Sequence, residues 1–343
     1  MKKKNIKIID KTLVTLSELY SDKIANNLNE ITELSVILNN IGTDCLEVSQ
    51  EILYLALPSV KSKNKHLIIK NNLDIKEYND FKLIVHDYIM FSNSKEPVRK
   101  IHVEIEIADA TKIDSLKDIA VLRGNVSGFT IKGLDNIMLY DYKAVYKKLI
   151  EFFGEDLSLC PGNSYGCASA IAIEWLVYGG RCVSTIYGGI GGGCPLEEVL
   201  AARRFIFNDK FQGNLTLLPK ATKLIESITK EKPSNNKPII GSSIFDFESG
   251  IHADGIFKNP KTYEPYNPKR IGTERHLIIG KHSGLTALKK KLGQLKIELN
   301  EDTLPNILES IRLDSSRKER SLSDNEILDI CKLAGGYIPW MRY

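Results

Sequence analysis

The residues best suited to chemistry lie close together between Glu248 and Gly284. This stretch contains three of the chain's 6 histidines, namely His252, His276 and His282. His252 and Asp254 are two positions apart among small residues, so that a base and a carboxylate could reach the same ligand. Glycines recur through the stretch and divide it into short turns, which can hold side chains in fixed directions. The pattern therefore predicts a site built from loops.

Composition places the chain among ordinary globular proteins. Its 343 residues are 43% hydrophobic and 26% charged, which suits one large α/β domain with a smaller one. The formal net charge of +4 is weak support for a polyanionic partner, so no nucleic acid is expected. No apolar run has the length of a membrane span, so no membrane partner is expected either.

Targeting signals and cysteine usage both indicate the cytoplasm. The strand-like run Ile6–Ile9 follows Met1–Lys4, where a signal peptide would have its apolar core. The 6 cysteines include no C-x-x-C pair, so we expect neither a zinc site nor a disulfide framework.

The elements that must position the motif stretch begin with alternating strand and helix patterns. Strand-like apolar runs fall at 6–10, 45–48, 66–69, 82–89, 101–107, 127–131, 136–140, 157–160 and 182–187. Helical spacing of apolar residues covers 22–42, 142–153, 165–178 and 195–207. This alternation predicts a parallel sheet, and the number of repeats favours a degenerate (β/α)8 TIM-like barrel. The connections near 71–80 and 90–100 are too short for full helices, so we expect irregularity there.

A polar, proline-flanked segment at 230–238 is the clearest domain boundary. We therefore predict a barrel over residues 1–232 and a linker subdomain over 233–280, which carries most of the motif stretch. A helical C-terminal subdomain is predicted over 281–343, where helical patterns occur at 285–293, 302–312 and 324–333.

A glycine cluster at 187–193 follows the last strand-like run, and Pro195 opens the next helical pattern. Such a turn could present backbone N–H groups to a phosphate. However, the cluster does not fit G-x-G-x-x-G in any register. A tight strand-to-helix turn at the barrel rim is the preferred interpretation.

Three motifs occur in order after the barrel. They are Phe247-Glu-Ser-Gly-Ile-His-Ala-Asp-Gly255, Lys261-Thr-Tyr-Glu-Pro265 and Leu277-Ile-Ile-Gly-Lys-His-Ser-Gly284. Together they resemble the region that follows the barrel in homocitrate and isopropylmalate synthases. Weaker similarity covers the barrel, at Ile8–Leu13, Leu46–Val48 and Leu196–Val199. The short helical end resembles the nitrogen-fixation type of homocitrate synthase, because isopropylmalate synthases carry a large regulatory domain there.

The resemblance implies a Claisen condensation of acetyl-CoA with a 2-oxo acid, in which a divalent metal polarises the ketone. The family holds its metal and the ketone oxygen with an Arg-Asp pair, a His-x-His pair and an asparagine. In this chain the corresponding positions are Val14, Thr15, Cys160, Gly162 and Thr185. One thiol and a threonine do not make a site for a hard cation, so we expect no metal on this chain.

The C-terminal motifs are intact by contrast. His252 and Tyr263 match a histidine and a tyrosine that, in the family, reach into the barrel of a neighbouring chain. The resemblance therefore implies that both are catalytic, His252 in proton transfer and Tyr263 as a hydrogen-bond donor to an anionic intermediate. Asp254 is expected to bind substrate. Half-buried structural roles for His252 and Tyr263 are the alternative.

Other residues of the stretch have structural interpretations. Ser283 is expected to cap the helix that begins near Leu285, with His282 packing or hydrogen-bonding locally. The basic residues Lys258, Lys261, Lys269 and Arg270 could meet CoA phosphates, but a solvated charged face is the more common role of such a cluster.

The altered barrel and the intact motifs together suggest a division of labour. The chain resembles the omega-type subunit of a split homocitrate synthase, inactive alone and paired with a homologous barrel subunit that carries Mg or Mn. Two alternatives remain. One is a non-catalytic regulatory or acyl-CoA-binding pseudoenzyme of the same family, and the other is a self-sufficient enzyme with metal-free chemistry in its own barrel.

Overall fold

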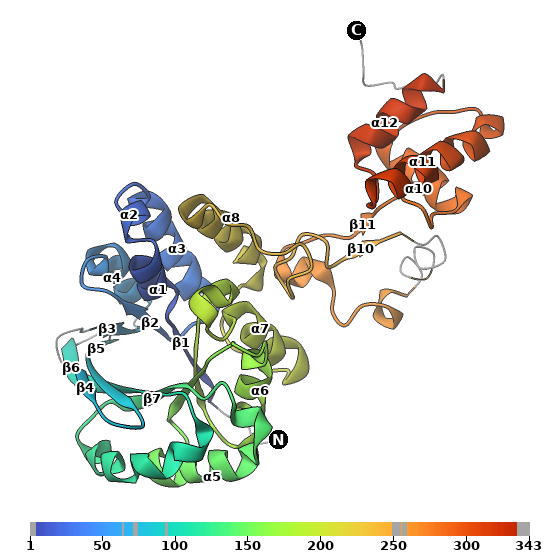
Figure 1. Ribbon diagram of the computed structural model, residues 1–343. Helices are drawn as coiled ribbons and strands as arrows, with labels where there is room; N and C mark the ends of the chain where they lie inside the picture. The colour runs from blue at the N-terminus through green and yellow to red at the C-terminus, as the bar shows by residue number, and fades with distance from the viewer. Residues whose placement is uncertain are drawn as a thin grey trace. The chain divides into compact units, whose positions relative to one another are not determined.

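The computed structural model describes residues 5–63, 65–70, 75–92, 95–248, 255 and 259–334 (Figure 1). The chain forms two compact units, residues 1–240 and 241–343. The first unit contains the barrel. The second contains the described parts of the motif stretch and the C-terminal helices. The domain limits expected at residues 232 and 280 stay predictions.

Among the described residues of the first unit, nine strands build one sheet. They are β1 (Lys7–Asp10), β2 (Cys45–Val48), β3 (His66–Ile69), β4 (Ile75–Glu77), β5 (Lys82–Ser92), β6 (Lys95–Ile107), β7 (Gly128–Gly133), β8 (Ser158–Pro161) and β9 (Cys182–Thr185). β1 pairs with both β2 and β9, and β3 pairs with β5, so the sheet closes on itself and leaves β4 outside the ring. The closed ring of eight strands confirms the predicted TIM-like barrel.

The barrel departs from a regular one where the sequence predicts irregularity. β5 runs antiparallel to both β3 and β6, while the other neighbouring pairs of the ring are parallel. A parallel crossover needs a dozen or more residues, and only two residues separate β5 from β6. The chain therefore turns back directly as a β-hairpin.

Helices surround most of the ring in Figure 1. They are α1 (Thr12–Leu19), α2 (Ser21–Ile24), α3 (Leu28–Ile41), α4 (Leu53–Ser62), α5 (Tyr142–Phe153), α6 (Ala168–Tyr178), α7 (Leu196–Ala201) and α8 (Leu218–Thr229), with a long 3₁₀ segment η1 (Ala110–Gly124). The strand predicted at 136–140 is wrong, because these residues contain a 3₁₀ turn, η2 (Ile137–Leu139). β7 ends at Gly133, whose φ of 107° turns the chain out of the sheet.

Alternate strand residues point into the barrel and form two layers. An apolar layer lies toward the strand beginnings and contains Ile9, Cys45, Ile68 and Cys182, with Tyr88 packed against it. Further toward the carboxyl ends of the parallel strands, the buried residues are charged or titratable: Lys11, Glu47, His86 and Glu104.

The second unit combines a small parallel strand pair with a helical core. The strands are β10 (Asp246–Phe247) and β11 (His276–Leu277), and the helices are α10 (Leu285–Leu295), α11 (Leu304–Lys318) and α12 (Asp324–Leu333). These helices confirm the three helical patterns of the sequence. Their apolar faces form one cluster, which also includes Leu277 and Ile279. In the described part of the chain, no helix has both the length and the apolar character that a membrane span requires.

Candidate functional site

The first and third motifs lie side by side in the second unit. β10 and β11 pair in parallel, with Asp246 opposite His276 and Phe247 opposite Leu277. Glu248 follows β10, and its carboxylate accepts the backbone N–H of His282 at 2.7 Å. This bond ties the beginning of the His252 segment to the Gly280–Gly284 turn.

That turn is tightly packed around Gly280. A Cβ at this position would lie 2.9 Å from Oε1 of Glu248 and 3.0 Å from the hydroxyls of Ser315 and Ser321. The N–H of Gly280 donates to the Ser283 hydroxyl at 3.0 Å. Only glycine leaves room for the Glu248 carboxylate to reach the turn.

Two expectations about this turn need correction. Ser283 does not cap helix α10: the capping position is Gly284, and no side chain caps it. The buried Ser283 hydroxyl instead accepts a hydrogen bond from the backbone N–H of Gly280, within the same turn. The side chain of His282 does not pack locally, because it is exposed, and the local hydrogen bond of this residue comes from its backbone.

Tyr263 lies at the other end of the His252 segment. It follows the 3₁₀ turn η6 (Pro260–Thr262), and its side chain is 45% exposed. Its ring rests on Gly255, where an added Cβ would lie 2.4 Å from the ring and 2.6 Å from the hydroxyl oxygen. The N–H of Asn259 also donates to the Gly255 carbonyl at 2.8 Å. The second motif is therefore fastened to the last residue of the first.

His252 and Asp254 lie outside the described residues, so their roles stay predictions. The described residues on either side, Glu248 and Gly255, are both anchored by the contacts given above. The segment that contains His252 and Asp254 thus begins and ends at fixed points.

A buried ion pair supports the second motif. Arg275 binds Glu264 through two hydrogen bonds of 2.5 and 2.6 Å, and the Glu264 side chain is only 8% exposed. Because Glu264 follows Tyr263 directly and Arg275 precedes β11, this bidentate pair fixes Tyr263 relative to the third motif.

Several basic residues of the stretch, and His276, face solvent. Lys261, Lys269 and Arg270 are exposed, as a solvated charged face would be. His276 is also exposed, and its Nδ1 lies 3.1 Å from Oδ1 of Asp246. Lys258 lies outside the described residues.

The packing at Gly280 makes a direct prediction. Gly280→Ala should destabilise the second unit by roughly 1–3 kcal/mol, because the added methyl group must displace Glu248, Ser315 or Ser321. Hydrogen exchange of α11, which carries Ser315, is the measurement, and exchange should become faster. Gly293→Ala is the matched control: no atom lies within 4 Å of its added Cβ in α10, so it should stabilise the unit by roughly 0.5–1 kcal/mol. Equal exchange rates in the two variants would contradict the assigned role of Gly280.

The barrel positions that correspond to the family's ligands carry no comparable donor set. Thr15 lies in α1, and the Thr185 hydroxyl donates to the carbonyl of Ile9 at 3.3 Å. Burial raises the pKa of the Cys160 thiol to about 11, and a soft sulfur ligand does not suit a hard cation. At Gly162 a Cβ would lie 1.5 Å from a carboxylate oxygen of Asp135, so this oxygen occupies the place of a side chain. These residues do not fit a hard divalent cation.

The glycine cluster forms a tight turn, as preferred from the sequence. Gly188, Gly189, Gly191 and Gly192 all have positive φ. The N–H of Gly188 donates to Glu197 at 2.8 Å, and burial raises the pKa of this carboxyl group to about 7. The Glu197 side chain already accepts the Gly188 N–H that a bound phosphate would need. This argues against a phosphate site in this turn.

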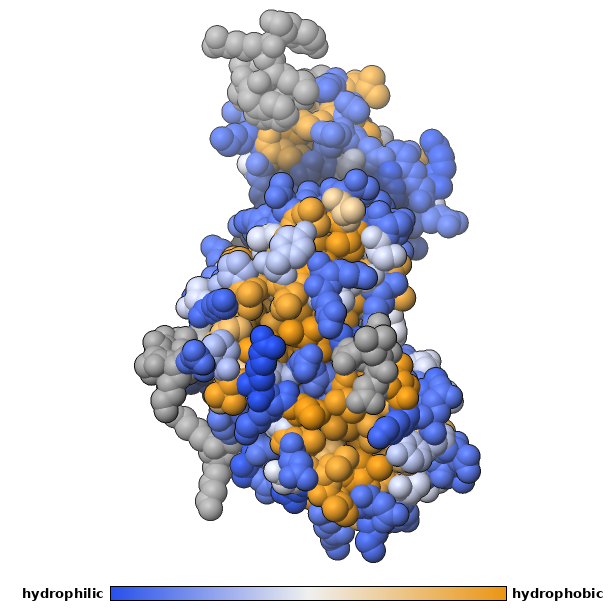
Figure 2. All heavy atoms as spheres, turned by 90° about the vertical axis from the view of Figure 1, so that its left-hand side faces the viewer, coloured by the Kyte–Doolittle hydropathy of each residue, from blue (hydrophilic) through white to orange (hydrophobic). Residues whose placement is uncertain are grey.

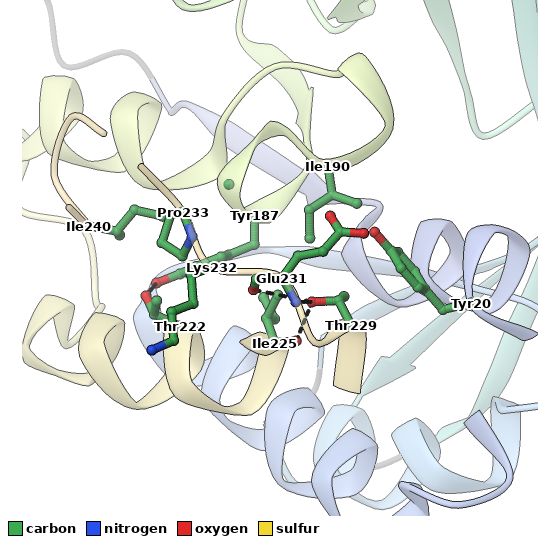
Figure 3. Close-up of a pocket in the computed structure, with 11 residues that line it drawn as sticks. Tyr20, Tyr187, Ile190, Thr222, Ile225, Thr229, Glu231, Lys232, Pro233 and Ile240 are labelled. Atoms are coloured by element: carbon green, nitrogen blue, oxygen red, sulfur yellow. Dashed lines mark hydrogen bonds between the residues drawn. The ribbon is translucent and has the colours of Figure 1, made fainter. Parts of the chain in front are cut away.

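An apolar pocket of about 230 Å³ lies between this turn, α8 and the segment 231–240 that follows α8 (Figure 3). Ile190 and Ile240 line it from opposite sides. At its edge the Tyr20 hydroxyl meets the Glu231 carboxylate, and burial together with this hydrogen bond raises the pKa of Tyr20. The surface of the pocket is mainly apolar, and the segment 231–240 closes one side of it.

Sequence reasoning missed the charged layer inside the barrel. Lys11, Glu47, His86 and Glu104 come from four segments that the closed sheet brings together. One signal was present: strand 101–107 carries His102, Glu104 and Glu106 at alternate positions, so one face of a central strand is polar. Such a face needs polar partners wherever it is buried.

Comparisons with known proteins agree with the motifs. Residues 239–319 match the family described as "Homocitrate synthase post-HMGL domain-like". The chain is 33% identical over 346 residues to "Homocitrate synthase, omega subunit" of Clostridium pasteurianum, covering 96% of each protein. It is 37% identical over 188 residues to "Homocitrate synthase AksA" of Methanothermobacter thermautotrophicus, covering 54% of this chain and 48% of that protein.

A further relative is named as an isopropylmalate synthase. The chain is 32% identical over 256 residues to "Probable 2-isopropylmalate synthase" of Ignicoccus hospitalis, covering 64% of this chain and 63% of that protein. The full-length match and the motif geometry lead to the same conclusion. The chain belongs to the homocitrate synthase and isopropylmalate synthase family.

Proposed function

We propose that this chain is one subunit of a two-subunit homocitrate synthase, which condenses acetyl-CoA with 2-oxoglutarate. It would donate His252 and Tyr263 to the site of a homologous barrel subunit and be inactive alone. The observation that carries this proposal is the match over 96% of both chains to a protein named as an omega subunit. Such a name implies at least one further subunit in that protein.

Two features of the structure support the division of labour. Glu248 and Gly255, the described residues on either side of His252, are both held by contacts, and the Tyr263 ring packs against Gly255. The barrel positions of the family's ligands carry Thr15, the protonated thiol of Cys160 and other residues that do not fit a metal. A chain that keeps the donated residues and lacks the family's own ligand residues is suited to complete a site on another chain.

The residues of this chain would have distinct roles. His252 would move a proton in the condensation or in the thioester hydrolysis, because a neutral imidazole exchanges protons readily near pH 7. The Tyr263 hydroxyl would donate a hydrogen bond to negative charge that develops on the substrate oxygen. Asp254 would bind substrate next to His252. The Mg or Mn ion expected on the partner would polarise the ketone of the 2-oxo acid.

The test is co-expression with a short homologue that carries the missing Arg-Asp and His-x-His residues. Thiol release from acetyl-CoA with 2-oxoglutarate should require both chains, and each chain alone should release no thiol above background. Full activity of this chain alone would contradict the proposal and support a self-sufficient enzyme.

Assembly gives a second prediction. On the face drawn in Figure 2, hydrophobic residues form several patches among hydrophilic ones. Large apolar side chains are exposed on α4, β4 and β6, including Tyr54, Ile75 and Ile101. Surfaces of this kind commonly bind another chain. In size-exclusion runs the chain should form a stable complex with the catalytic partner, and homodimers or aggregates without it. A soluble monomer that ignores the partner would argue against the proposal.

One observation favours the alternative, a regulatory or acyl-CoA-binding pseudoenzyme. The apolar pocket beside the glycine turn, about 230 Å³ in volume, could hold a short acyl group. The alternative requires that acetyl-CoA binds to the isolated chain and that adding the chain to a competent barrel subunit fails to raise thiol release. The two-subunit enzyme requires that thiol release rises.

A further inference from the structure

A lysine ammonium group lies inside the barrel between two buried carboxylates. Lys11 follows β1 directly and is 5% exposed. Its Nζ lies 3.2 Å from Oε1 of Glu47 and donates a hydrogen bond to Oε2 of Glu104. Both carboxylate side chains are almost completely buried, at 2% and 1% exposure.

The same place has the donor set of a metal site. Glu47, His86 and Glu104 each offer a ligand atom, and these three atoms lie within 4.8 Å of one another. Two carboxylates and one imidazole suit Mn²⁺, Co²⁺ or Zn²⁺. The second oxygen of Glu104 is buried and has no hydrogen-bond partner among the described residues, so the cluster has unused acceptor capacity.

The protonation states are consistent with a cation in the middle of the cluster. Although burial opposes it, the charge of Lys11 holds the pKa of Glu104 at about 2, so this carboxylate is ionised at neutral pH. Burial lowers the pKa of His86 to about 4, so the imidazole is neutral there. Burial alone would lower the pKa of Lys11, but the carboxylates of Glu104 and Glu47 raise it well above its ordinary value. The ion pairs that Nζ makes with both carboxylates hold the ammonium in place.

We propose that the Lys11 ammonium is the resident cation of this barrel, and that it takes the place of a divalent metal ion between Glu47, His86 and Glu104. The single positive charge neutralises part of the buried carboxylate pair and occupies the space between them. A divalent ion would have to displace an ammonium group that is bound to both carboxylates, and the two cations would repel each other across a poorly screened interior.

The proposal predicts opposite metal binding in two versions of the full chain. The wild type should bind no Mn²⁺ or Co²⁺ in the barrel. Lys11→Met removes the charge and keeps a chain of similar shape, so Glu47, His86 and Glu104 should then bind one metal ion. Its affinity should exceed that of the wild type on the order of 100-fold or more.

Equilibrium dialysis with MnCl₂, followed by metal analysis, measures this difference, and CoCl₂ reports the ligands through its visible absorption bands. Lys11→Arg keeps a cation and should bind no more metal than the wild type. Lys11→Met combined with Glu104→Gln should lose the gained site. Stoichiometric binding by the wild type that Glu104→Gln abolishes would overturn the proposal, as would a folded Lys11→Met chain that binds no metal.

A measurement on the wild type covers the case in which Lys11→Met fails to fold. In the protein labelled with ¹⁵N-lysine, a buried ammonium should give a slowly exchanging ¹H–¹⁵N signal that is missing from Lys11→Arg. Stoichiometric MnCl₂ should leave this signal sharp. Selective broadening at that concentration would place Mn²⁺ next to Lys11 and overturn the proposal. None of these outcomes depends on whether the chain acts as a homocitrate synthase subunit.

Discussion

Replacing His252 by alanine should lower the turnover of the proposed two-subunit enzyme roughly 10²–10⁴-fold, the usual contribution of one acid–base group. The complex itself should stay intact, because the described contacts of Glu248 and Gly255 on either side do not involve residue 252. Steady-state thiol release from acetyl-CoA with 2-oxoglutarate gives the turnover. Size-exclusion chromatography of the same sample gives the assembly state.

Two further variants separate chemistry from packing. Tyr263→Phe should cost less than His252→Ala, because it removes one hydrogen bond and keeps the ring that rests on Gly255. His282→Ala is the matched control from the same stretch. Its side chain is exposed and its bond to Glu248 comes from the backbone, so turnover and assembly should both stay near wild type. Near-normal turnover of His252→Ala in an intact complex would identify the chain as a scaffold or regulator.

The barrel could be predicted because its signal is repeated along the chain. Alternating strand and helix patterns need only local periodicity to be recognised. The antiparallel β5 could not be predicted, because strand direction depends on how the chain returns and not on the pattern within the strand. The error at 136–140 has a similar cause: the apolar run there is short, and the chain leaves the sheet at Gly133 before it.

The two candidate sites differ in how much the sequence reveals. The C-terminal candidate site is built from neighbouring motifs, so order and spacing are enough to predict it. The details of its turn were not predicted, since the role of Ser283 depends on Glu248, 35 residues away. The charged layer of the barrel depends on longer separations: Lys11 and Glu104 are 93 residues apart and meet only because the sheet closes. Single-strand patterns do not carry that information.

The contact between Lys11 and Glu104 leads to the second large prediction. Glu104→Gln should lower the free energy of unfolding of the barrel by about 3 kcal/mol at pH 7. In the variant, the buried Lys11 ammonium keeps one carboxylate partner, Glu47. The expected loss of stability therefore lies at the low end of the range for a broken buried ion pair. Urea unfolding followed through the fluorescence of Trp175, which is fully buried in α6, measures the loss. The second tryptophan, Trp340, is replaced by phenylalanine in all variants.

The pH dependence of this loss tests its electrostatic origin. The pKa of Glu104 is lowered from 4.5 to about 2 in the folded state, so its charge stabilises the fold fully above pH 4.5. That contribution is lost as the pH falls from 4.5 toward 2, and the difference between wild type and Glu104→Gln should shrink in the same range. Glu106→Gln, two positions along the same strand, is the control. Its pair with Lys132 is 32% and 42% exposed, so it should cost less than about 1 kcal/mol. If Glu104→Gln costs no more than Glu106→Gln, or if its cost persists unchanged near pH 2, Lys11 does not stabilise the barrel as a buried counter-ion.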